Sequence, residues 1–227
     1  KSVFVGLKQF HYIFTMPSFR QAFVNTIIIA FFKITLSILV PLVLSLMLNE
    51  VTKSWFKRSV QTIVFIPYFF SWAILAGMVL EIFAYDGVIN NVLESLFGME
   101  PIAFLVSNKY FRTIVIGSDV WKGMGYNTVL LLAAITNVDP TLHEAAQVDG
   151  AGRWKQMLHV TLPGIMPMVA VLTVLGLGGI LNAGFEQILI MYNPTVEKTV
   201  DILDTLVYRL GMVSHQYSAA AAMGLFK

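Results

Sequence analysis

The sequence of 227 residues contains no cysteine and few charged residues. Without cysteine there is no disulfide bond, no cysteine-ligated metal and no thiol catalysis, and the redox compartment is left open. Only 12% of the residues are charged, whereas 57% are hydrophobic, so there is too little polar surface to cover a soluble globule of this length. The composition therefore indicates an integral membrane protein.

Other function classes lack their signatures. The net charge of +2 and the absence of a lysine and arginine cluster argue against nucleic-acid binding. No Gly-x-x-x-x-Gly-Lys-Ser/Thr loop occurs, so ATP is not expected to bind to this chain. The segment from His143 to Gln147 is one imidazole short of the zinc-protease pattern His-Glu-x-x-His, so no metal site is expected. Because no nucleophile–base arrangement is found either, the chain is predicted not to be an enzyme.

Long hydrophobic runs are present and predict membrane-spanning helices. A helix needs about 20 apolar residues to cross the hydrocarbon core of a bilayer. Four stretches qualify, residues 22–48, 60–84, 111–135 and 162–185, and a fifth opens near Ser218. The expected fold is all-α, a polytopic bundle with about five visible spans in one transmembrane domain, residues 1–227. Since the chain starts without Met and stops inside an apolar run, we expect it to be truncated at both ends.

The polar segment between the third and fourth predicted spans, residues 136–161, contains a short helix by its capping signals. Asp139 or Thr141 can cap free N–H groups at the helix start, and Pro140 is tolerated in the first turn. Thr141 and Glu144 also have the spacing of a capping box. About two turns would follow, and Gly150 would end the helix with a positive φ angle.

This short helix has the features of a docking element. Its apolar surface is thin, so it is not stable alone and needs another surface to lie against. Ala145 and Ala146 allow the backbone of a partner to approach closely. Glu144 and Asp149 can accept charge-assisted hydrogen bonds from that partner.

The docking segment also resembles a known family. Glu144-Ala145-Ala146, three residues and Gly150, then Leu162-Pro163 and Pro167, resemble the cytoplasmic loop of bacterial ABC-importer permeases. In that family the loop forms a coupling helix that sits in a cleft of the ATPase subunit. The form Asp149-Gly150-Ala151 resembles the carbohydrate-importer branch. Further stretches resemble its oligosaccharide and polysaccharide permeases, so that the resemblance covers nearly the whole chain: Leu48-Asn49-Glu50-Val51, Phe56-Lys57-Arg58, Gln61-Thr62, Ile66-Pro67, Gly184-Phe185-Glu186 and Gly224-Leu225-Phe226-Lys227.

The resemblance implies a type I ABC importer permease fold and a set of partners. These are a second homologous permease, two ATPase subunits that carry ATP and Mg, and an external solute-binding protein that delivers an oligosaccharide. The chain itself would bind no cofactor and would lie in the bacterial inner membrane as a multi-pass protein. The residues that couple it to the ATPase would be Glu144, Ala145, Ala146, Asp149, Gly150, Ala151 and Pro163.

The distribution of basic residues agrees with this orientation. Residues 49–59 and 136–161 would face the cytoplasm, and this face has the higher density of basic residues, as the positive-inside rule expects. The basic residues of these two segments are Lys53, Lys57, Arg58, Arg153 and Lys155. Residues 85–110 and 186–217 would then lie outside, where a solute-binding protein can reach them.

Charged and aromatic side chains inside the predicted spans are candidates for a substrate path. Lys33 and Lys122 fall near the middle of their spans, where a charge is costly unless it faces a partner or water. The stretch Trp121-Lys122-Gly123-Met124-Gly125-Tyr126-Asn127 offers aromatic faces, a hydroxyl, an amide and an ammonium, which suit a sugar. In maltose-type permeases a similar Trp-x-Gly-x-x-Tyr stretch contributes to the sugar site. The resemblance therefore assigns the path to Trp121, Lys122, Gly123, Tyr126 and Asn127, with Asn182 and Glu186 on the next span; Lys122 departs from the family's apolar residue and would suit an acidic glycan.

Structural alternatives stand beside these assignments. Lys122 could pair with Asp119, one turn earlier on the same helix. Lys33 could snorkel or pair with a neighbouring subunit. Trp121 and Tyr126 could be ordinary packing residues. The glycines of the fourth span could serve close helix packing rather than ligand contact; these are Gly176, Gly178 and Gly179.

Two alternative functions remain open at this point. One is an ABC permease for another solute, such as an amino acid, a phosphate or a metal. The other is a secondary transporter or channel that works without ATP. The second would require several buried carboxylates along an ion path, whereas Glu81 and Asp119 are the only acids within the predicted spans.

Overall fold

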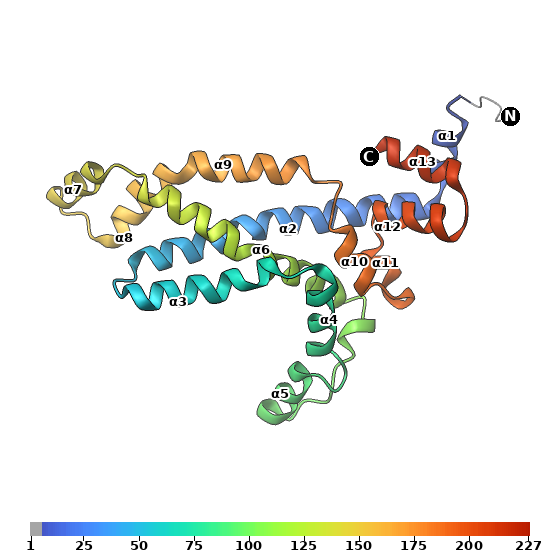
Figure 1. Cartoon of the computed structure of the whole chain (residues 1–227), viewed down its shortest axis with the longest axis horizontal. Coiled ribbons are helices and arrows are strands. Elements are labelled where there is room, and N and C mark those ends of the chain that lie inside the picture. The colour runs from blue at the N-terminus through green and yellow to red at the C-terminus, as the bar shows by residue number, and fades with distance from the viewer. Residues whose placement is uncertain (1–5) are drawn as a thin grey trace. The chain divides into compact units, whose positions relative to one another are not determined.

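The computed structural model describes residues 6–227, and all regular elements within that range are helical. These residues form two compact units. Figure 1 labels the helices along the chain. Unit 1 comprises the described part of Lys1–Phe32, together with Ser71–Ser118 and Gly179–Lys227. Unit 2 comprises Lys33–Phe70 and Asp119–Gly178. Two long helices contribute residues to both units, α2 (Pro17–Glu50) and α6 (Phe111–Thr136).

The remaining elements are shorter. Unit 2 contains α3 (Ser54–Phe65), η1 (Ile66–Phe69), α7 (Pro140–Val148), α8 (Arg153–Gln156), the π-turn η3 (Met157–Thr161) and α9 (Leu162–Gly178). Unit 1 contains α1 (Lys8–Thr15), α4 (Trp72–Ile82), α5 (Val88–Phe97), η2 (Phe104–Val106), α10 (Phe185–Met191), η4 (Pro194–Val196), α11 (Glu197–Val200), α12 (Leu203–Tyr208), η5 (Arg209–Val213) and α13 (Tyr217–Phe226).

Two helical stretches are by themselves long and apolar enough to cross a membrane, Pro17–Glu50 and Arg153–Gly178. A third candidate is the bent pair Ser54–Phe69 and Trp72–Ile82, if it counts as one span. Helix α6 has 26 residues and spans about 39 Å, but the polar stretch around Lys122 lowers its apolar content. The predicted first and third spans agree with α2 and α6 in position, and the fifth begins at α13. The number of membrane crossings stays a prediction.

The predicted span 60–84 is not one straight helix. Its two halves meet at an angle of 109°, with the break between Phe69 and Trp72. Pro67 has no N–H group to continue the α-helical hydrogen bonds, and Phe70 and Ser71 are extended. The uniform apolar character of this stretch concealed the break.

The predicted span 162–185 is displaced toward the N-terminus. The continuous helical stretch runs from Arg153 to Gly178, and α10 starts separately at Phe185. Gly184, with φ of +97°, precedes α10 and separates it from the stretch before. Part of the segment predicted as the polar loop, residues 153–161, is therefore helix, and its last turn is a π-turn just before Pro163.

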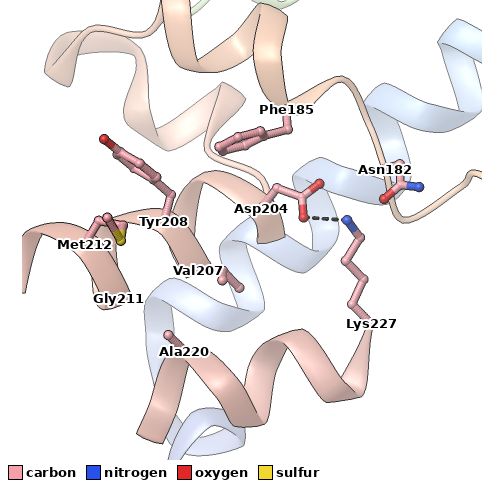
Figure 2. Close-up of a pocket in the computed structure, with 9 residues that line it drawn as sticks. All are labelled: Asn182, Phe185, Asp204, Val207, Tyr208, Gly211, Met212, Ala220 and Lys227. Carbon is pink, nitrogen blue, oxygen red and sulfur yellow. Dashed lines mark hydrogen bonds and ion pairs between the residues drawn. The ribbon is translucent and has the colours of Figure 1, made fainter. Parts of the chain in front are cut away.

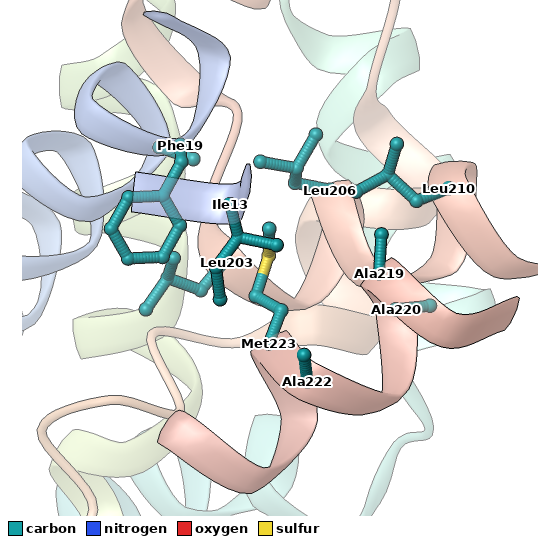
Figure 3. Close-up of a cluster of buried hydrophobic side chains, with 10 residues drawn as sticks. Ile13, Phe19, Leu203, Leu206, Leu210, Ala219, Ala220, Ala222 and Met223 are labelled. Atoms are coloured by element: carbon teal, nitrogen blue, oxygen red, sulfur yellow. The ribbon is translucent and has the colours of Figure 1, made fainter. Parts of the chain in front are cut away.

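Unit 1 is held by an apolar cluster between α1, α2, α12 and α13. Ile13, Leu203 and Met223 are completely buried there, and Phe19 and Leu206 lie beside them (Figure 3). The aliphatic side chains come from segments that are about 200 residues apart, so the cluster joins the beginning of the described chain to its end. Burying such side chains contributes about 1.5–3 kcal/mol each.

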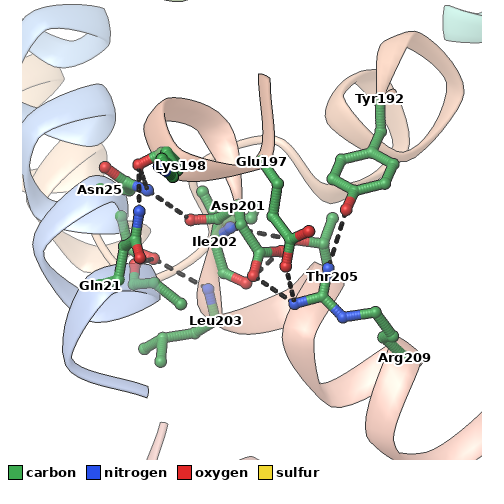
Figure 4. Close-up of polar contacts among 12 residues, drawn as sticks. Gln21, Asn25, Tyr192, Glu197, Lys198, Asp201, Ile202, Leu203, Thr205 and Arg209 are labelled. Atoms are coloured by element: carbon green, nitrogen blue, oxygen red, sulfur yellow. Dashed lines mark hydrogen bonds and ion pairs between the residues drawn. The ribbon is translucent and has the colours of Figure 1, made fainter. Parts of the chain in front are cut away.

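A polar network beside this cluster fixes α12 against α2 (Figure 4). Asn25 Nδ2 donates to the carbonyl oxygen of Asp201 at 3.0 Å, and Leu203 N donates to Thr26 Oγ1 at 3.0 Å. The Asp201 carboxylate accepts hydrogen bonds from Arg209 Nη2 at 2.6 Å and from Thr205. Burial raises the pKa of Asp201, and the hydrogen bond from Thr205 and the charge of Arg209 partly offset that effect.

Candidate functional site

The N-terminal end of the predicted coupling helix is capped as its sequence suggests. Asp139 is the N-cap of α7, and its Oδ1 accepts a hydrogen bond from Thr141 N at 2.9 Å. Thr141 is therefore inside the helix, and the expected capping box with Glu144 does not form, because Pro140 takes the first helical position. The hydrogen bond lowers the pKa of Asp139. The charged cap therefore stabilises α7 fully at pH values above the ordinary pKa of aspartate. That contribution is lost as the pH falls through the lowered pKa.

The C-terminal end of α7 is a Schellman motif. Ala151 N donates to Ala146 O at 2.8 Å and Gly150 N donates to Gln147 O at 3.0 Å. Gly150 has the expected positive φ, +76°. Both ends of α7 are thus closed by local hydrogen bonds, which defines this two-turn helix despite its small apolar surface.

Most of the surface of α7 is exposed, although His143 and Ala146 are half-buried where the helix meets α8 and η3. No residue of the helix is buried, and Val148 at its end is 88% exposed. Glu144 and Ala145 are exposed, and Trp154 on α8 is 72% exposed. Figure 1 shows α7 and α8 beyond the adjoining ends of α6 and α9 in unit 2. The helix predicted to dock is therefore available to a partner.

The predicted substrate-path residues of unit 2 cluster where α6 faces the end of η1. Lys122 is half-buried, and its Nζ donates to the carbonyl oxygens of Tyr68, at 3.3 Å, and of Phe70. Those carbonyls lie where the broken span leaves backbone groups without helical partners. The ammonium of Lys122 therefore donates hydrogen bonds to backbone carbonyls at the break. The polar stretch of α6 thus has a structural role in this conformation.

Lys33 and Asp119 form an ion pair in unit 2. Lys33 Nζ lies 3.1 Å from Asp119 Oδ1, and the Lys33 side chain is only 7% exposed. Asp119 on α6 thus has Lys33 on α2 as an ion-pair partner, and the pairing of Asp119 with Lys122 stays a prediction. A buried charge is tolerated when it is paired in this way.

Aromatic and small residues of α6 complete the contact with α3 and η1. Tyr126 stacks on Tyr68 with ring centroids 4.9 Å apart, yet Tyr126 remains 41% exposed. Gly125 is buried against α3, and a Cβ there would lie 2.7 Å from the carbonyl carbon of Val64. Asn127 Nδ2 donates to Ser37 O at 2.9 Å, whereas Gly123 has open space around it. Trp121 is half-buried on the same helix.

The other two predicted path residues belong to unit 1. Glu186 is exposed in the first turn of α10. Asn182 lines a cavity of about 600 Å³ together with Phe185, Asp204 and Tyr208 (Figure 2). The sequence did not predict the lining residues from α12 and α13, because no motif or spacing near Asn182 indicates that these segments pack beside it.

One further prediction about packing, and one buried residue that the sequence did not single out, can be compared with the structure. Gly176 lies against α2, where a Cβ would be 3.1 Å from Ile34 Cγ2, so it serves helix packing. Gln187 is completely buried and donates to Val115 O at 2.7 Å and to Ser118 Oγ at 2.8 Å. Among residues 6–227, no group of three or more His, Asp or Glu side chains is arranged to hold a metal ion.

Comparisons with known proteins agree with this architecture. The family described as "Binding-protein-dependent transport system inner membrane component" matches residues 33–226. The polygalacturonan/rhamnogalacturonan transport system permease protein YteP of Bacillus subtilis is 41% identical over 226 residues, which cover 100% of this chain and 70% of YteP. The protein LplB of the same organism is 41% identical over 228 residues, covering 100% of this chain and 71% of LplB.

Solved structures are similar over the same length. A chain of a bacterial ABC transporter involved in the import of the acidic polysaccharide alginate superposes with a TM-score of 0.94 and 40% identity. That match covers 100% of this chain and 79% of the other. A chain of an amino acid ABC transporter is 17% identical with a TM-score of 0.58, which is a similarity of fold alone.

Proposed function

Because the chain belongs to the family of binding-protein-dependent transport system inner membrane components, we propose that it is the permease subunit of an ABC importer for an acidic oligosaccharide. The observation that carries this proposal is the 40% identity and TM-score of 0.94 to a chain of the alginate importer over the full length. YteP, named for polygalacturonan and rhamnogalacturonan transport, supports the same class of cargo. Both named cargoes are glycans that contain uronic acids.

A second structure of the alginate transporter supports the external solute-binding protein. The alginate transporter also crystallised in complex with an alginate pentasaccharide-bound periplasmic protein, and this chain covers 77% of the matched chain there at 40% identity. A periplasmic protein of this kind would deliver the glycan to the segments predicted to lie outside, residues 85–110 and 186–217. The acidic cargo rests on these relatives, because Lys122 donates to carbonyl oxygens in the present conformation.

Energy would enter through α7. Two ATPase subunits would bind and hydrolyse ATP with Mg, and each would hold the coupling helix of one permease. The exposure of Glu144 and the closed Schellman end at Gly150 support a rigid element with a free docking surface. ATP binding to the ATPase subunits can favour one conformation of the permease only through contacts whose free energy differs between the conformations. In this proposal those contacts are made by α7. The other residues of this coupling surface are Ala145, Ala146, Asp149, Ala151 and Pro163.

The apolar surface of unit 2 fits both a bilayer and a second permease. Val171, Val174 and Leu175 on α9 are between 53% and 70% exposed. Such side chains are stable in lipid or against another apolar helix, and the family resemblance implies a homologous permease. The single transmembrane domain and the multi-pass arrangement belong to this proposal.

Uptake by the reconstituted importer tests the proposed function. The full-length permease, its partner permease, the ATPases and the binding protein would be placed in liposomes loaded with ATP. We expect uptake of oligogalacturonate and none of a neutral malto-oligosaccharide of equal length. Omitting ATP, or replacing it with a non-hydrolysable analogue, should abolish uptake.

Other results would favour the alternatives. Uptake of amino acids but of no glycan would keep the ABC permease and reject the carbohydrate cargo. Uptake that persists without ATP and stops when ion gradients are dissipated would indicate a secondary transporter.

A further inference from the structure

The cavity of unit 1 has an amphipathic lining that no part of the proposed function uses so far. It has a volume of about 600 Å³, within the range of small-molecule sites, about 300–1,000 Å³. Its walls come from the start of α10 and from α12, η5 and α13. The buried cluster around Leu203 and Met223 and the network around Asp201 hold α12, η5 and α13 together, so the walls that these elements form are packed from behind.

The two ends of the cavity differ in chemistry (Figure 2). At one end the rings of Phe185 and Tyr208 lie 6.0 Å apart between centroids and tilt at 53° to each other. At the other end lie the amide of Asn182 and the ion pair between Asp204 and Lys227. Tyr208 is 40% exposed, so its ring is accessible from the cavity mouth.

This combination matches the surface of a pyranose ring. The C–H face of a sugar packs on an aromatic ring, while its hydroxyls both donate and accept hydrogen bonds. Asn182 supplies a donor and an acceptor, Asp204 supplies acceptors and Lys227 supplies donors. A lipid chain suits this space less well, because its methylene groups would leave the amide of Asn182 without a hydrogen bond and would offer nothing to the Asp204–Lys227 pair.

We propose that this cavity binds one sugar ring of the transported glycan, with Tyr208 as the stacking surface and Asn182, Asp204 and Lys227 as its hydrogen-bonding groups. The inference rests on the proposed function and adds a substrate subsite in unit 1. Lys227 also offers a positive group to the carboxylate of a uronate ring. Asp204 then contacts the hydroxyls of that ring.

Residues 1–227 contain no cysteine, so a cysteine introduced there is the only one in this segment and can be labelled. Met212 lines the cavity and is 64% exposed, so the variant Met212→Cys reports access to it. Maleimide labelling of this subunit would be followed in the complete assembly, with a galacturonate pentasaccharide as the probe. We expect the glycan to slow labelling of Met212→Cys about fivefold or more as it fills the cavity.

A matched control is Tyr85→Cys, since Tyr85 is 63% exposed in unit 1 and does not line the cavity. Its labelling rate should not change with glycan. If Met212→Cys does not assemble, Val207→Cys reports on the same space, since Val207 also lines the cavity and is not one of the proposed binding groups. In the Met212→Cys background, Tyr208→Ala should raise the glycan concentration for half-maximal protection about tenfold, and Tyr208→Phe should leave it nearly unchanged.

The outcomes separate this inference from the proposed function. If the parent assembly takes up the glycan but Met212→Cys and Val207→Cys label equally fast with and without it, the subsite is wrong and the function stands. Equal protection at the cavity and at Tyr85→Cys also rejects the subsite. If the parent assembly takes up no glycan, the cargo assignment is wrong and the subsite falls with it.

Discussion

At the scale of single residues, the polar groups of the apolar helices satisfy one another. Lys33 is paired with Asp119 at 3.1 Å, and Lys122 donates to the carbonyl oxygens at the break after η1. Both lysines stand at positions where an unpaired charge is costly. Their placement was visible in the sequence, but their partners come from segments 52 to 86 residues away. The contact of α6 with α3 depends in turn on a residue without a side chain, Gly125.

We predict that Gly125→Ala destabilises the permease, whereas Gly123→Ala does not. A Cβ at Gly125 would lie 2.7 Å from a backbone carbon of Val64, which cannot rotate away, so α3 and α6 must separate. Such overpacking costs roughly 1–3 kcal/mol. Gly123, two residues earlier, has nothing within 4 Å, and alanine there gains about 1 kcal/mol of helix propensity. Thermal unfolding of the purified assembly measures both, and equal midpoints for the two variants would contradict the contact.

At the scale of elements, proline, glycine and capping residues determine where each helix begins, bends or ends. The break after η1 follows Pro67, and the π-turn η3 comes just before Pro163, because proline cannot donate the next backbone hydrogen bond. The coupling helix α7 is closed by Asp139 at one end and by Gly150 at the other. These signals are local, so the sequence predicted α7 nearly to the residue, while the bend of 109° after Phe69 was not foreseen.

Replacing Gly150 should loosen the coupling helix. An alanine at φ of +76° costs about 1–2 kcal/mol, although the space around Gly150 is open. We expect Gly150→Ala to lower the uptake per ATP hydrolysed about fivefold, since 1 kcal/mol of lost coupling corresponds to that factor. Gly152→Ala is the control, because Gly152 has φ of −68° and equally open surroundings. If Gly150→Ala leaves the uptake per ATP hydrolysed unchanged, the Schellman motif at the end of α7 does not contribute to coupling.

At the scale of the whole molecule, exposed hydrophobic side chains and exposed charged side chains lie on different segments, as is typical of a membrane protein. Exposed valines and leucines of α9 lie on a helix whose most apolar window is only 11% buried. By contrast, the polar segment with α7 carries exposed charged residues such as Glu144 and Arg153. By the positive-inside rule, the higher density of basic residues near α7 predicts that this end faces the cytoplasm.

The orientation can be mapped with single cysteines. In vesicles that contain the permease without its ATPase subunits, Val148→Cys on α7 should react with a membrane-impermeant maleimide when the vesicles are inside-out and not when they are right-side-out. Tyr217→Cys, at the start of α13, should show the opposite pattern. Both side chains are well exposed, at 88% and 64%, so a lack of reaction reflects the membrane and not burial. Labelling of both variants from one side would contradict the predicted topology.

The sequence by itself determined the membrane character, the positions of α2 and α6 and the caps of α7. Each depends on composition, on hydrophobic length or on signals a few residues apart, and such information is local. The tertiary structure alone decided the ion pair of Lys33, the role of Lys122 at the break and the cavity formed by Asn182 with residues of α12 and α13. These features depend on which distant segments pack together. The fold determines which residues come close to a given side chain, and their shape and charge then decide its contacts.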